Sequence, residues 1–577
     1  MRYYIGLATT FHDPAIAIVA PDGEVLFAEA AERFLQYKRA PNCEPDLAPR
    51  MGALLRRWVP EGAEVVVATS WGEDFSGFLD GSARSGAFDL PSLAGLSPEL
   101  NRSFVPERSE RALVASLHLQ QRRAGLGTLL GVDRAGGGRR FAELRRYGHH
   151  LSHAAYACGT SPFEEAACLV VDGMGETGAA ALFACEGGRL RELKRHRGRG
   201  SVGFFFGLVT DLAGFDQAAG EEWKIMGLAP YGRRDPDLMA LLRRLYRVEG
   251  ERLTFADAET IRAVAAEILA RRPPGAEKEG WADLSRCGQD AFEEMMAAYL
   301  AEARALSGSQ NLVLAGGCAL NSSFNGKIAG RHGFGHLHVP SAPADDGNAI
   351  GAAWLALAQD DPAWRAAPGP ATPYLGSAVS TEPLERMTAW EPRLRHLGHE
   401  GVTEAAADIL ADGKLVGWVQ GRAEFGPRAL GNRSILADPR PADAKELLNA
   451  KVKYREAFRP FAPSILAEHG PAWFEDYQDS PYMERTLVWR EEVRPRVPAV
   501  VHEDGTGRLQ SVTAERNPRY AALIRAFAER SGVPILLNTS FNVMGKPILH
   551  TAEDAILMFY TTGLDAIVVE DWLLTKT

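Results

Sequence analysis

Several features that would place this chain in a common protein class are missing from its sequence. None of the six cysteines forms a Cys-x-x-Cys pair, which argues against a zinc ribbon and a thioredoxin-like redox site. The apolar runs stop well short of the roughly 18 residues that a membrane span needs. The first residues enter a strand-like pattern without the apolar segment of a secretory signal. We therefore expect a cytoplasmic protein without a membrane partner, because scattered cysteines are typical of a reducing compartment.

Two nucleotide and hydrolase motifs are absent as well. The sequence has no GxxxxGK[ST] phosphate loop and no GxSxG nucleophile elbow. An excess of basic residues is also lacking, since 64 Lys and Arg stand against 74 Asp and Glu, a formal net charge of −10. A protein that coats nucleic acid carries a basic excess, so we expect no nucleic-acid partner. The average charge can still conceal a local basic site.

The chain itself has 577 residues of ordinary globular composition, with 46% hydrophobic and 24% charged residues. At about 150 residues per domain this is roughly four units, or two large domains. Four prolines between residues 362 and 373 resist both helix and sheet pairing. We therefore predict a first domain over 1–360, a linker over 361–380 and a second domain, α/β in pattern, over 381–577.

Residues 3–29 and 167–196 share one pattern of three short strands separated by turns rich in Gly and Asp. Two such blocks in one chain predict an internal duplication, with chance resemblance of two hairpins as the alternative. Further along, the pattern predicts helices over 256–271 and 291–306 and a buried strand over 311–315. The fold class predicted for the whole chain is α/β.

The first group of residues suited to chemistry is a histidine cluster. On a helix, His149 and His153 are four residues apart and share one face. Two imidazoles so placed can bind one divalent metal, although His150 stands where a hydrolytic zincin requires glutamate. For this pair alone, a structural or surface role is the stronger alternative.

Two carboxylate motifs and one glycine motif follow predicted strands or precede predicted helices. Asp172 ends a hydrophobic strand before Gly-x-Gly, and Asp345-Asp346-Gly347 leads into a small-residue helix. Either motif suits a metal or phosphate site, but an Asx turn and simple helix capping are the structural alternatives. Gly316-Gly317 follows the buried strand and would let the backbone approach a ligand.

The strongest signal lies at residues 421–434, GRAEFGPRALGNRS, which places Arg422, Arg428 and Arg433 among glycines and a proline. A solvated helix face would not have this spacing. Planar guanidinium groups on a tight loop suit the oxygens of phosphate or carboxylate, which they hold in pairs. The alternative without a binding role is a set of scattered surface arginines. Arg459 and Arg508 lie in similarly short, constrained segments, and Asn538 follows the strand predicted over 534–537.

Together these motifs resemble the carbamoyltransferase family of antibiotic and nodulation-factor biosynthesis. The resemblance covers nearly the whole chain. It rests on HHLSHAAYA at 149–157, VVDGMGE at 170–176, EEWKIMGLAPYG at 221–232, AGGCALN at 315–321, DDGNAIGAA at 345–353, GRAEFGPRALGNRSILADPR at 421–440, FRPFAPS at 458–464 and NTSFN at 538–542. It implies an actin-like, duplicated first domain (Kae1-like, of the hexokinase and Hsp70 superfamily) and a YrdC-like α/β second domain.

The resemblance implies an ATP-dependent O-carbamoyltransferase. Carbamoyl phosphate and ATP, with Mg, would form carbamoyl adenylate in the second domain. The first domain would transfer the carbamoyl group to a hydroxyl of a small natural product such as an antibiotic or sugar. It would hold a divalent metal, usually iron in this family, and the chain would form a homodimer. The alternative is a tRNA threonylcarbamoyladenosine-type modification enzyme, against which the net charge argues. A non-enzymatic nucleotide switch would leave the arginine-rich domain unexplained.

The resemblance also assigns roles by position. The implied metal ligands are His149, His153, Asp172 and Asp345, the last preferred to Asp346 because the family pattern is Asp-x-Gly. Carbamoyl phosphate and ATP would bind Arg428, Arg433, Arg459, Arg508 and Asn538. The adenylate would bind Gly316, Gly317, Asn321 and Lys224. The catalytic residues would be Asp172, Arg428, Arg459, Arg508 and His12, with His12 as general base on the acceptor hydroxyl. Acceptor specificity is expected in regions without a readable motif, such as 76–140.

Overall fold

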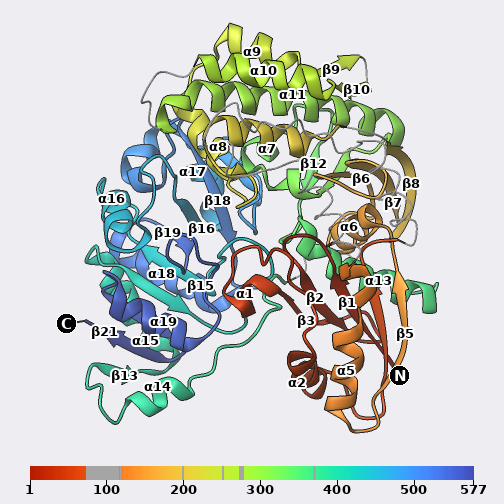
Figure 1. Ribbon diagram of the computed structural model, residues 1–577. Helices are drawn as coiled ribbons and strands as arrows, with labels where there is room; N and C mark the ends of the chain where they lie inside the picture. Colours follow the sequence, from red (N-terminus) through yellow and green to blue (C-terminus); the bar gives the residue numbers. More distant parts are fainter. Residues whose placement is uncertain are drawn as a thin grey trace. The chain divides into compact units, whose positions relative to one another are not determined.

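The computed structural model of the protein (Figure 1) describes residues 1–72, 119–197, 200–249, 252–271, 278–367 and 372–576, together with Ser116 and Gly369. Residues 76–115, most of the stretch in which we expect acceptor specificity, lie outside the described residues, as do Pro368 and Pro370 of the predicted linker. The chain divides into two units. Unit 1 comprises residues 1–31, 39–321 and 328–371, and unit 2 comprises residues 32–38, 322–327 and 372–577.

The first sheet of unit 1 has the strand order β3-β2-β1-β4-β5. Its strands are β1 (Arg2–Ala8), β2 (Ala15–Val19), β3 (Val25–Ala30), β4 (Glu64–Thr69) and β5 (Arg140–Arg146). The first three strands pair antiparallel, whereas β4 pairs parallel to β1 and β5 pairs parallel to β4. The three short strands predicted within residues 3–29 are therefore present.

The second sheet repeats this design. Its order is β12-β11-β6-β7-β8, with β6 (Glu165–Val171), β7 (Ala180–Glu186), β8 (Arg189–His196), β11 (Asn311–Ala315) and β12 (His336–His338). Again the first three strands pair antiparallel, and two parallel strands extend the sheet beyond the first of them. Order and direction thus match strand for strand. The predicted α/β class and the duplication expected of an actin-like domain are confirmed.

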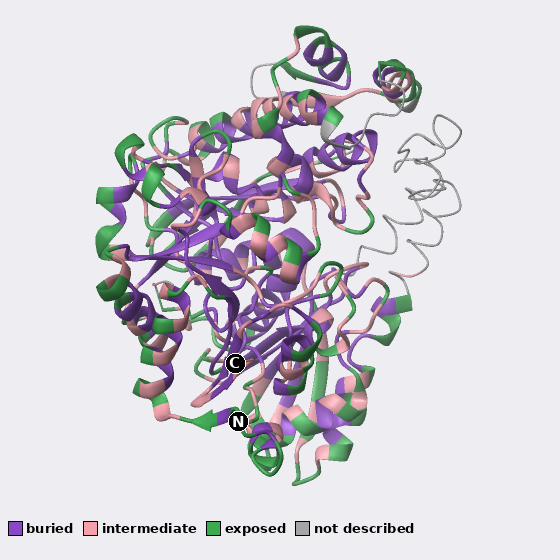
Figure 2. Cartoon of the chain, turned by 90° about the vertical axis from the view of Figure 1, so that its left-hand side faces the viewer, coloured by how far each residue is buried: buried purple, intermediate pink, exposed green. Residues whose placement is uncertain are grey.

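Helices cover these sheets because their strands are apolar on both faces, as in β2, whose five residues are all buried. Figure 2 shows buried residues concentrated in the strands. Helix α13 (Asn348–Asp360) packs on β1 and β2 as well as on α6 (His149–Gly159), which itself contacts β6 and β11. Gly6 permits this close approach, since a Cβ atom there would lie 1.7 Å from the carbonyl oxygen of Ala349. The contact brings α6 and the start of α13 together.

The remaining elements of unit 1 are mostly helical. They are α2 (Ala48–Trp58), α5 (Leu126–Ala135), α7 (Val202–Leu212), α8 (Glu222–Leu228), α9 (Pro236–Arg243), β9 (Tyr246–Glu249), β10 (Arg252–Phe255), α10 (Ala258–Ala270) and α11 (Ala282–Ser307). Helix α11 begins nine residues before its predicted start at 291. Its first turns pack through small residues such as Gly288, against which Val209 of α7 lies, so they lack the apolar periodicity that marks a helix. Among the described residues, no helix is both long and apolar enough to cross a membrane.

Unit 2 is built on a nine-stranded mixed sheet of order β13-β21-β20-β14-β15-β19-β16-β18-β17. The strands are β13 (Leu394–His396), β14 (Val416–Val419), β15 (Arg433–Ala437), β16 (Ala462–Leu466), β17 (Arg485–Val488), β18 (Thr506–Val512), β19 (Ile535–Ser540), β20 (Ala566–Val569) and β21 (Trp572–Thr575). Alternate residues face two separate cores: Trp418 belongs to one and Val419 to the other. The likeness of this unit to a YrdC fold stays a prediction.

Helices complete both cores of unit 2. They are α14 (Glu382–Met387), α15 (Gly398–Ala411), α16 (Ala444–Leu448), α17 (Gly470–Trp473), α18 (Pro518–Ser531) and α19 (Ala552–Thr561). Helices α15 and α18 pack together in the core that contains Trp418, and α19 contributes Phe559 to the other. Two segments from earlier in the chain also belong to this unit, α1 (Ala31–Leu35) in large part and α12 (Ser322–Asn325).

Candidate metal centre and anion site

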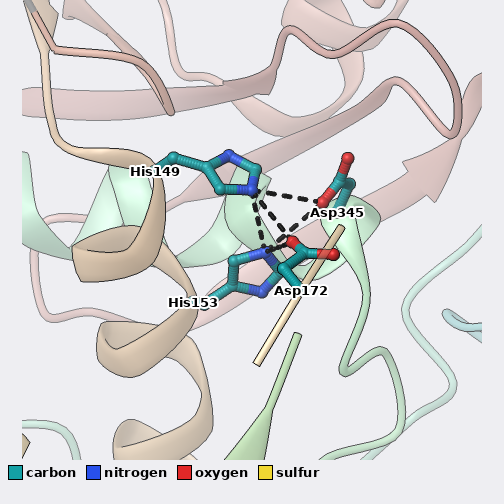
Figure 3. Close-up of side chains that lie close together, drawn as sticks. All are labelled: His149, His153, Asp172 and Asp345. Atoms are coloured by element: carbon teal, nitrogen blue, oxygen red, sulfur yellow. Dashed lines mark hydrogen bonds and ion pairs between the residues drawn. The ribbon is translucent and has the colours of Figure 1, made fainter. Parts of the chain in front are cut away.

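Four side chains of unit 1 converge on one point (Figure 3). His149 and His153 come from the first two turns of α6, Asp172 follows β6, and Asp345 begins a single 3-10 turn (Asp345–Gly347) that leads into α13. One ligand atom from each residue lies within 4.8 Å of the other three. All four residues are buried, so the group forms an internal cluster rather than a surface patch.

The distances show how the four groups share this point. The Nε2 atoms of His149 and His153 each lie 3.1 Å from Oδ2 of Asp172 and 3.3 Å from one another. They lie 3.4 and 3.3 Å from Oδ1 of Asp345. Two imidazole nitrogens and two carboxylate oxygens therefore face inward. This donor set suits a divalent transition metal.

The electrostatics of the cluster favour positive charge between its members. Burial disfavours a charged imidazole, yet the negative charge of Asp345 and a hydrogen bond with Asp172 outweigh it and raise the pKa of His149 to about 10. Burial and the charge of Asp172 oppose ionisation of Asp345, but the histidines lower its pKa to about 2. A proton or a divalent cation can supply this positive charge, and a cation would need neutral imidazoles.

Groups around the cluster hold its members in place. Asp172 accepts hydrogen bonds at Oδ1 from the backbone N–H groups of Gly173 (2.7 Å) and Gly317 (3.2 Å), which turns Oδ2 toward the histidines. The Asn348 amide lies 3.3 Å from Nδ1 of His149, and its Oδ1 is buried without a hydrogen bond. A half-turn of that amide would let Oδ1 accept from Nδ1–H and leave Nε2 for a metal. The residues thus fit a bound metal ion.

The contacts also bear on the alternatives that the sequence left open. Asp345 faces the histidines, whereas Asp346 accepts from the backbone N–H of Gly347 at 3.1 Å. Asp172 forms the short turn contact with Gly173 and the contacts with the histidines at once, one through each oxygen. A structural turn and a ligand position are therefore compatible at this residue.

His12 lies in the turn after β1, beside a carboxylate and an arginine. Its Nδ1 is 2.9 Å from Oδ2 of Asp13, the same oxygen to which Arg39 donates at 3.2 Å. Burial raises the pKa of Asp13, but Arg39 and His12 outweigh it and lower that pKa. The charge of Asp345 acts on both Asp13 and Arg39, so this turn lies near the cluster of two histidines and two aspartates. The His12 side chain is 40% exposed and accessible to a solute.

The residues expected to bind the adenylate have varied surroundings. Gly316 has a φ of +86°, and a Cβ atom there would lie 2.2 Å from the carbonyl oxygen of Val171. Asn321 and Gln289 exchange two hydrogen bonds of 3.0 and 3.1 Å. Lys224 is buried and pairs with Glu221 at 2.5 Å. Their part in ligand binding stays a prediction.

Unit 2 holds a different kind of site, centred on Arg428 and Arg508. Both side chains are mostly buried, and within the described part of the chain neither makes a hydrogen bond or an ion pair. Burial lowers the pKa of Arg428 to about 10. Burial, together with the charges of Arg428 and Arg455, lowers the pKa of Arg508. Two mostly buried guanidinium groups without an acceptor among the described residues would suit an anion as their partner.

Two further cations belong here that the sequence analysis missed. Burial and the charge of Arg459 lower the pKa of Arg455 to about 9, and burial with both of these arginines lowers that of Lys453 well below its usual value. We call these residues the arginine cluster: Arg428, Arg455, Arg459 and Arg508. Lys453 adds charge beside it but is held by Asn542, to whose Oδ1 and carbonyl it donates at 2.7 and 3.0 Å. The segment KVKYREAFR, 451–459, with four cations in nine residues, was the available signal. Among the residues that the structure describes, only Arg459 of this cluster has a carboxylate partner, Glu456 at 3.1 Å.

Buried polar side chains fix the loop that carries Arg428. One oxygen of Glu424 accepts from the backbone N–H groups of Leu430, Asn432 and Arg433 at 2.7, 2.8 and 3.1 Å. Asn538 donates to the carbonyl of Ala429 at 3.2 Å, and Gln510 donates to that of Leu430 at 2.9 Å. Asn538 therefore supports the residue next to Arg428 from strand β19. The loop is held independently of any ligand.

Arg433 and Arg422 have surroundings unlike those we expected. Arg433 is fully buried and donates to the backbone carbonyls of Gln420 (2.6 Å), Asn432 (2.9 Å), Gly421 (3.0 Å) and Ser377 (3.1 Å). Arg422 donates to the carbonyls of Leu375 and Gly376. These contacts tie the loop together through the backbone, so we leave both residues out of the proposed anion site.

Comparisons with known proteins agree with these motifs. A family model described as "Carbamoyltransferase N-terminus" matches residues 128–354, and one described as "Carbamoyltransferase C-terminus" matches 407–576. Nodulation protein NolNO of Sinorhizobium fredii is 39% identical over 436 residues, which cover 74% of this chain and 63% of that protein. Protein sll1178 of Synechocystis is 33% identical over 100% of this chain and 97% of its own length.

Among solved structures, component A of the Acidaminococcus fermentans (R)-2-hydroxyglutaryl-CoA dehydratase matches 62% of this chain and 99% of its own, at 9% identity and a TM-score of 0.29. A score this low adds nothing to the assignment. The family models together match more than half of the chain, on both of its units, and they name an enzyme of carbamoyl transfer. The chain therefore belongs to the carbamoyltransferase family.

Proposed function

We propose that unit 2 binds carbamoyl phosphate and ATP at the arginine cluster and joins them as carbamoyl adenylate. The observation that supports this most strongly is the pair of mostly buried guanidinium groups, Arg428 and Arg508, without a hydrogen-bond acceptor in the described chain. Phosphate oxygens are among the acceptors that paired guanidinium groups hold well. Arg455 and Arg459 add positive charge nearby, which the negative charge of two phosphorylated substrates would require.

The proposed first reaction has two parts. Water cleaves carbamoyl phosphate to carbamate and phosphate. A carbamate oxygen then attacks the α-phosphorus of ATP, and the bond to pyrophosphate breaks. Negative charge builds up on phosphoryl oxygens in both parts, so cations fixed before the reaction would lower both barriers. Asn538 and Glu424 contribute by holding the Arg428 loop.

Unit 1 would carry out the transfer. Its four converging residues, His149, His153, Asp172 and Asp345, would hold a divalent metal, for which iron is our proposal. When bound, the metal supplies a Lewis acid that polarises the carbamoyl carbonyl. His12 would accept the proton of the acceptor hydroxyl at Nε2, because its Nδ1 faces Asp13. The hydroxyl oxygen attacks the carbamoyl carbon, and AMP leaves.

The acceptor we propose is a small hydroxylated natural product, with no nucleic acid involved. The net charge of −10 supports this, because a nucleic-acid partner favours a basic excess, and the arginine cluster suits small phosphates. A cytoplasmic location and a homodimer remain parts of the proposal. Gly316, Gly317, Asn321 and Lys224 would bind the adenylate in unit 1.

The test is the exchange of labelled pyrophosphate into ATP in the presence of carbamoyl phosphate and Mg. We expect exchange by the wild-type protein and its loss in Arg428→Ala. Arg525→Ala, which changes an exposed arginine of α18, serves as the matched control and should exchange at the wild-type rate. Wild-type protein that forms no adenylate, or Arg428→Ala that retains full exchange, would contradict the proposal.

A further inference from the structure

The turn that carries Asp172 brings a second carboxylate to the start of the histidine helix. Glu176 is 6% exposed, and its Oε1 accepts hydrogen bonds from the backbone N–H groups of His149 (2.6 Å) and Gly72 (3.1 Å). Helix α6 begins at His149, and its N-cap residue, Gly148, has no side chain to cap it. Glu176 therefore supplies from another element the cap that the helix lacks locally.

The turn itself is closed and tightly packed. Backbone hydrogen bonds join Asp172 to Ala179 and Gly175 to Gly178, both at 2.8 Å. A Cβ atom on Gly175 would lie 2.6 Å from the ring of His150, so the turn rests directly on α6. One closed turn thus delivers a proposed metal ligand and, four residues later, the cap of the helix that carries two others.

The same carboxylate also connects α6 to the segment after β4. Gly72, the second donor to Glu176, follows Trp71, whose ring stacks on that of His149 with centroids 4.3 Å apart and an angle of 20° between the planes. The backbone N–H and the ring of His149 are therefore held by two neighbouring contacts. A change at Glu176 would loosen the first of them directly and the second through Gly72.

We propose that Glu176 is a positioning residue of the metal centre, which sets the first turn of α6 so that His149 and His153 meet Asp172. The inference rests on the proposed metal site. His153 lies about 6 Å along the helix from His149, so one displaced turn would move both imidazoles. The carboxylate also lies at the positive end of the helix dipole, which favours its charge there. Without it, the buried N–H of His149 would lack an acceptor.

The test compares metal affinity among variants at this position, measured by competition of Zn²⁺ and Fe²⁺ with a chromophoric chelator. Glu176→Ala removes the cap, and we expect it to weaken binding by about 10- to 100-fold, as changes around metal ligands do. Glu176→Gln keeps an acceptor oxygen at the same reach and loses only the charge, so we expect a loss of about two- to five-fold. Glu176→Asp keeps the charge but is one methylene too short, and should bind more weakly than Glu176→Gln.

The matched control is Glu186→Ala, an exposed carboxylate at the end of β7 whose loss should leave affinity unchanged. Affinity in Glu176→Ala equal to that of the wild type would overturn the proposal, as would Glu176→Asp binding as tightly as Glu176→Gln. If Glu176→Ala fails to fold, the comparison of Glu176→Asp with Glu176→Gln tests the proposal by itself. Pyrophosphate exchange in unit 2 should persist in all variants. Its absence from the wild type would count against the proposed function and leave the metal result standing.

Discussion

The two candidate sites favour ligands of opposite charge. In unit 1, two imidazoles lie against two carboxylates at 3.1 to 3.4 Å, and the cluster is complete only with positive charge at its centre. In unit 2, several cations lie together, and two of them, Arg428 and Arg508, have no acceptor in the described chain. Burial and pairing therefore favour positive charge, a proton or a metal ion, at the first site and an anion at the second.

The largest expected effect comes from removing Asp172, the carboxylate that both histidines contact. Asp172→Ala should lower metal affinity by more than the roughly 100-fold limit for residues around the ligands, because it deletes a ligand. Carbamoyl transfer should fall with it, while pyrophosphate exchange continues. Metal content after dialysis and the exchange rate measure the two effects. Loss of exchange in this variant would show that the two sites do not work separately.

The converse change is Arg508→Ala. We expect pyrophosphate exchange to fall by roughly 10²- to 10³-fold, the usual effect of losing one donor that stabilises transition-state charge. Metal content should stay at the wild-type level. Arg516→Ala, which removes a surface arginine paired with Asp479, is the control for loss of charge in the same unit. Equal exchange in Arg508→Ala and its control would remove Arg508 from the site.

Opposite pH dependences should distinguish the sites. His149, with a raised pKa of about 10, is protonated at neutral pH without metal, and that proton competes with a cation. Metal affinity should therefore rise with pH, by up to tenfold per unit for each proton displaced. Burial and the charges of Arg455 and Arg459 lower the pKa of Lys453 well below its usual value, so this lysine loses its charge as pH rises and binding of pyrophosphate should fall. Two profiles with the same slope would contradict the assigned charges.

The smallest expected effect concerns stability. Since Arg508 is crowded by Arg428 and Arg455, its removal should relieve repulsion and raise the melting temperature by a few degrees without ligand. Pyrophosphate should stabilise the wild type and leave Arg508→Ala nearly unchanged. Differential scanning fluorimetry with and without pyrophosphate measures both. A variant less stable than the wild type would give Arg508 a structural role.

The sequence predicted best what depends on local spacing. The pair His149 and His153, four residues apart, lies on one helix face, and the two three-stranded blocks begin equivalent sheets. The sequence predicted contacts less well when the two partners lie far apart in the chain. Nothing near Glu176 in the sequence indicates that it caps a helix 27 residues earlier.

The arginines show the same limit. Arg433 and Arg428 have nearly identical local sequences, yet within the described residues Arg433 donates to four carbonyls and Arg428 to none. The backbone oxygens that surround a guanidinium group are set by the folded sheet and loops, and the local sequence alone does not indicate them. Lys453 and Arg455 were missed for a related reason, since a mixed run of charges also fits an exposed helix.

The central claim is that adenylate formation needs the cations of unit 2 and not the metal of unit 1. It is tested most directly with wild-type protein stripped of transition metal by a chelator, which is then removed, and supplied with carbamoyl phosphate, ATP and Mg. We predict that quenched samples contain carbamoyl adenylate and pyrophosphate in equal amounts, with no transfer to any acceptor hydroxyl. Absence of adenylate until transition metal is restored would contradict the account.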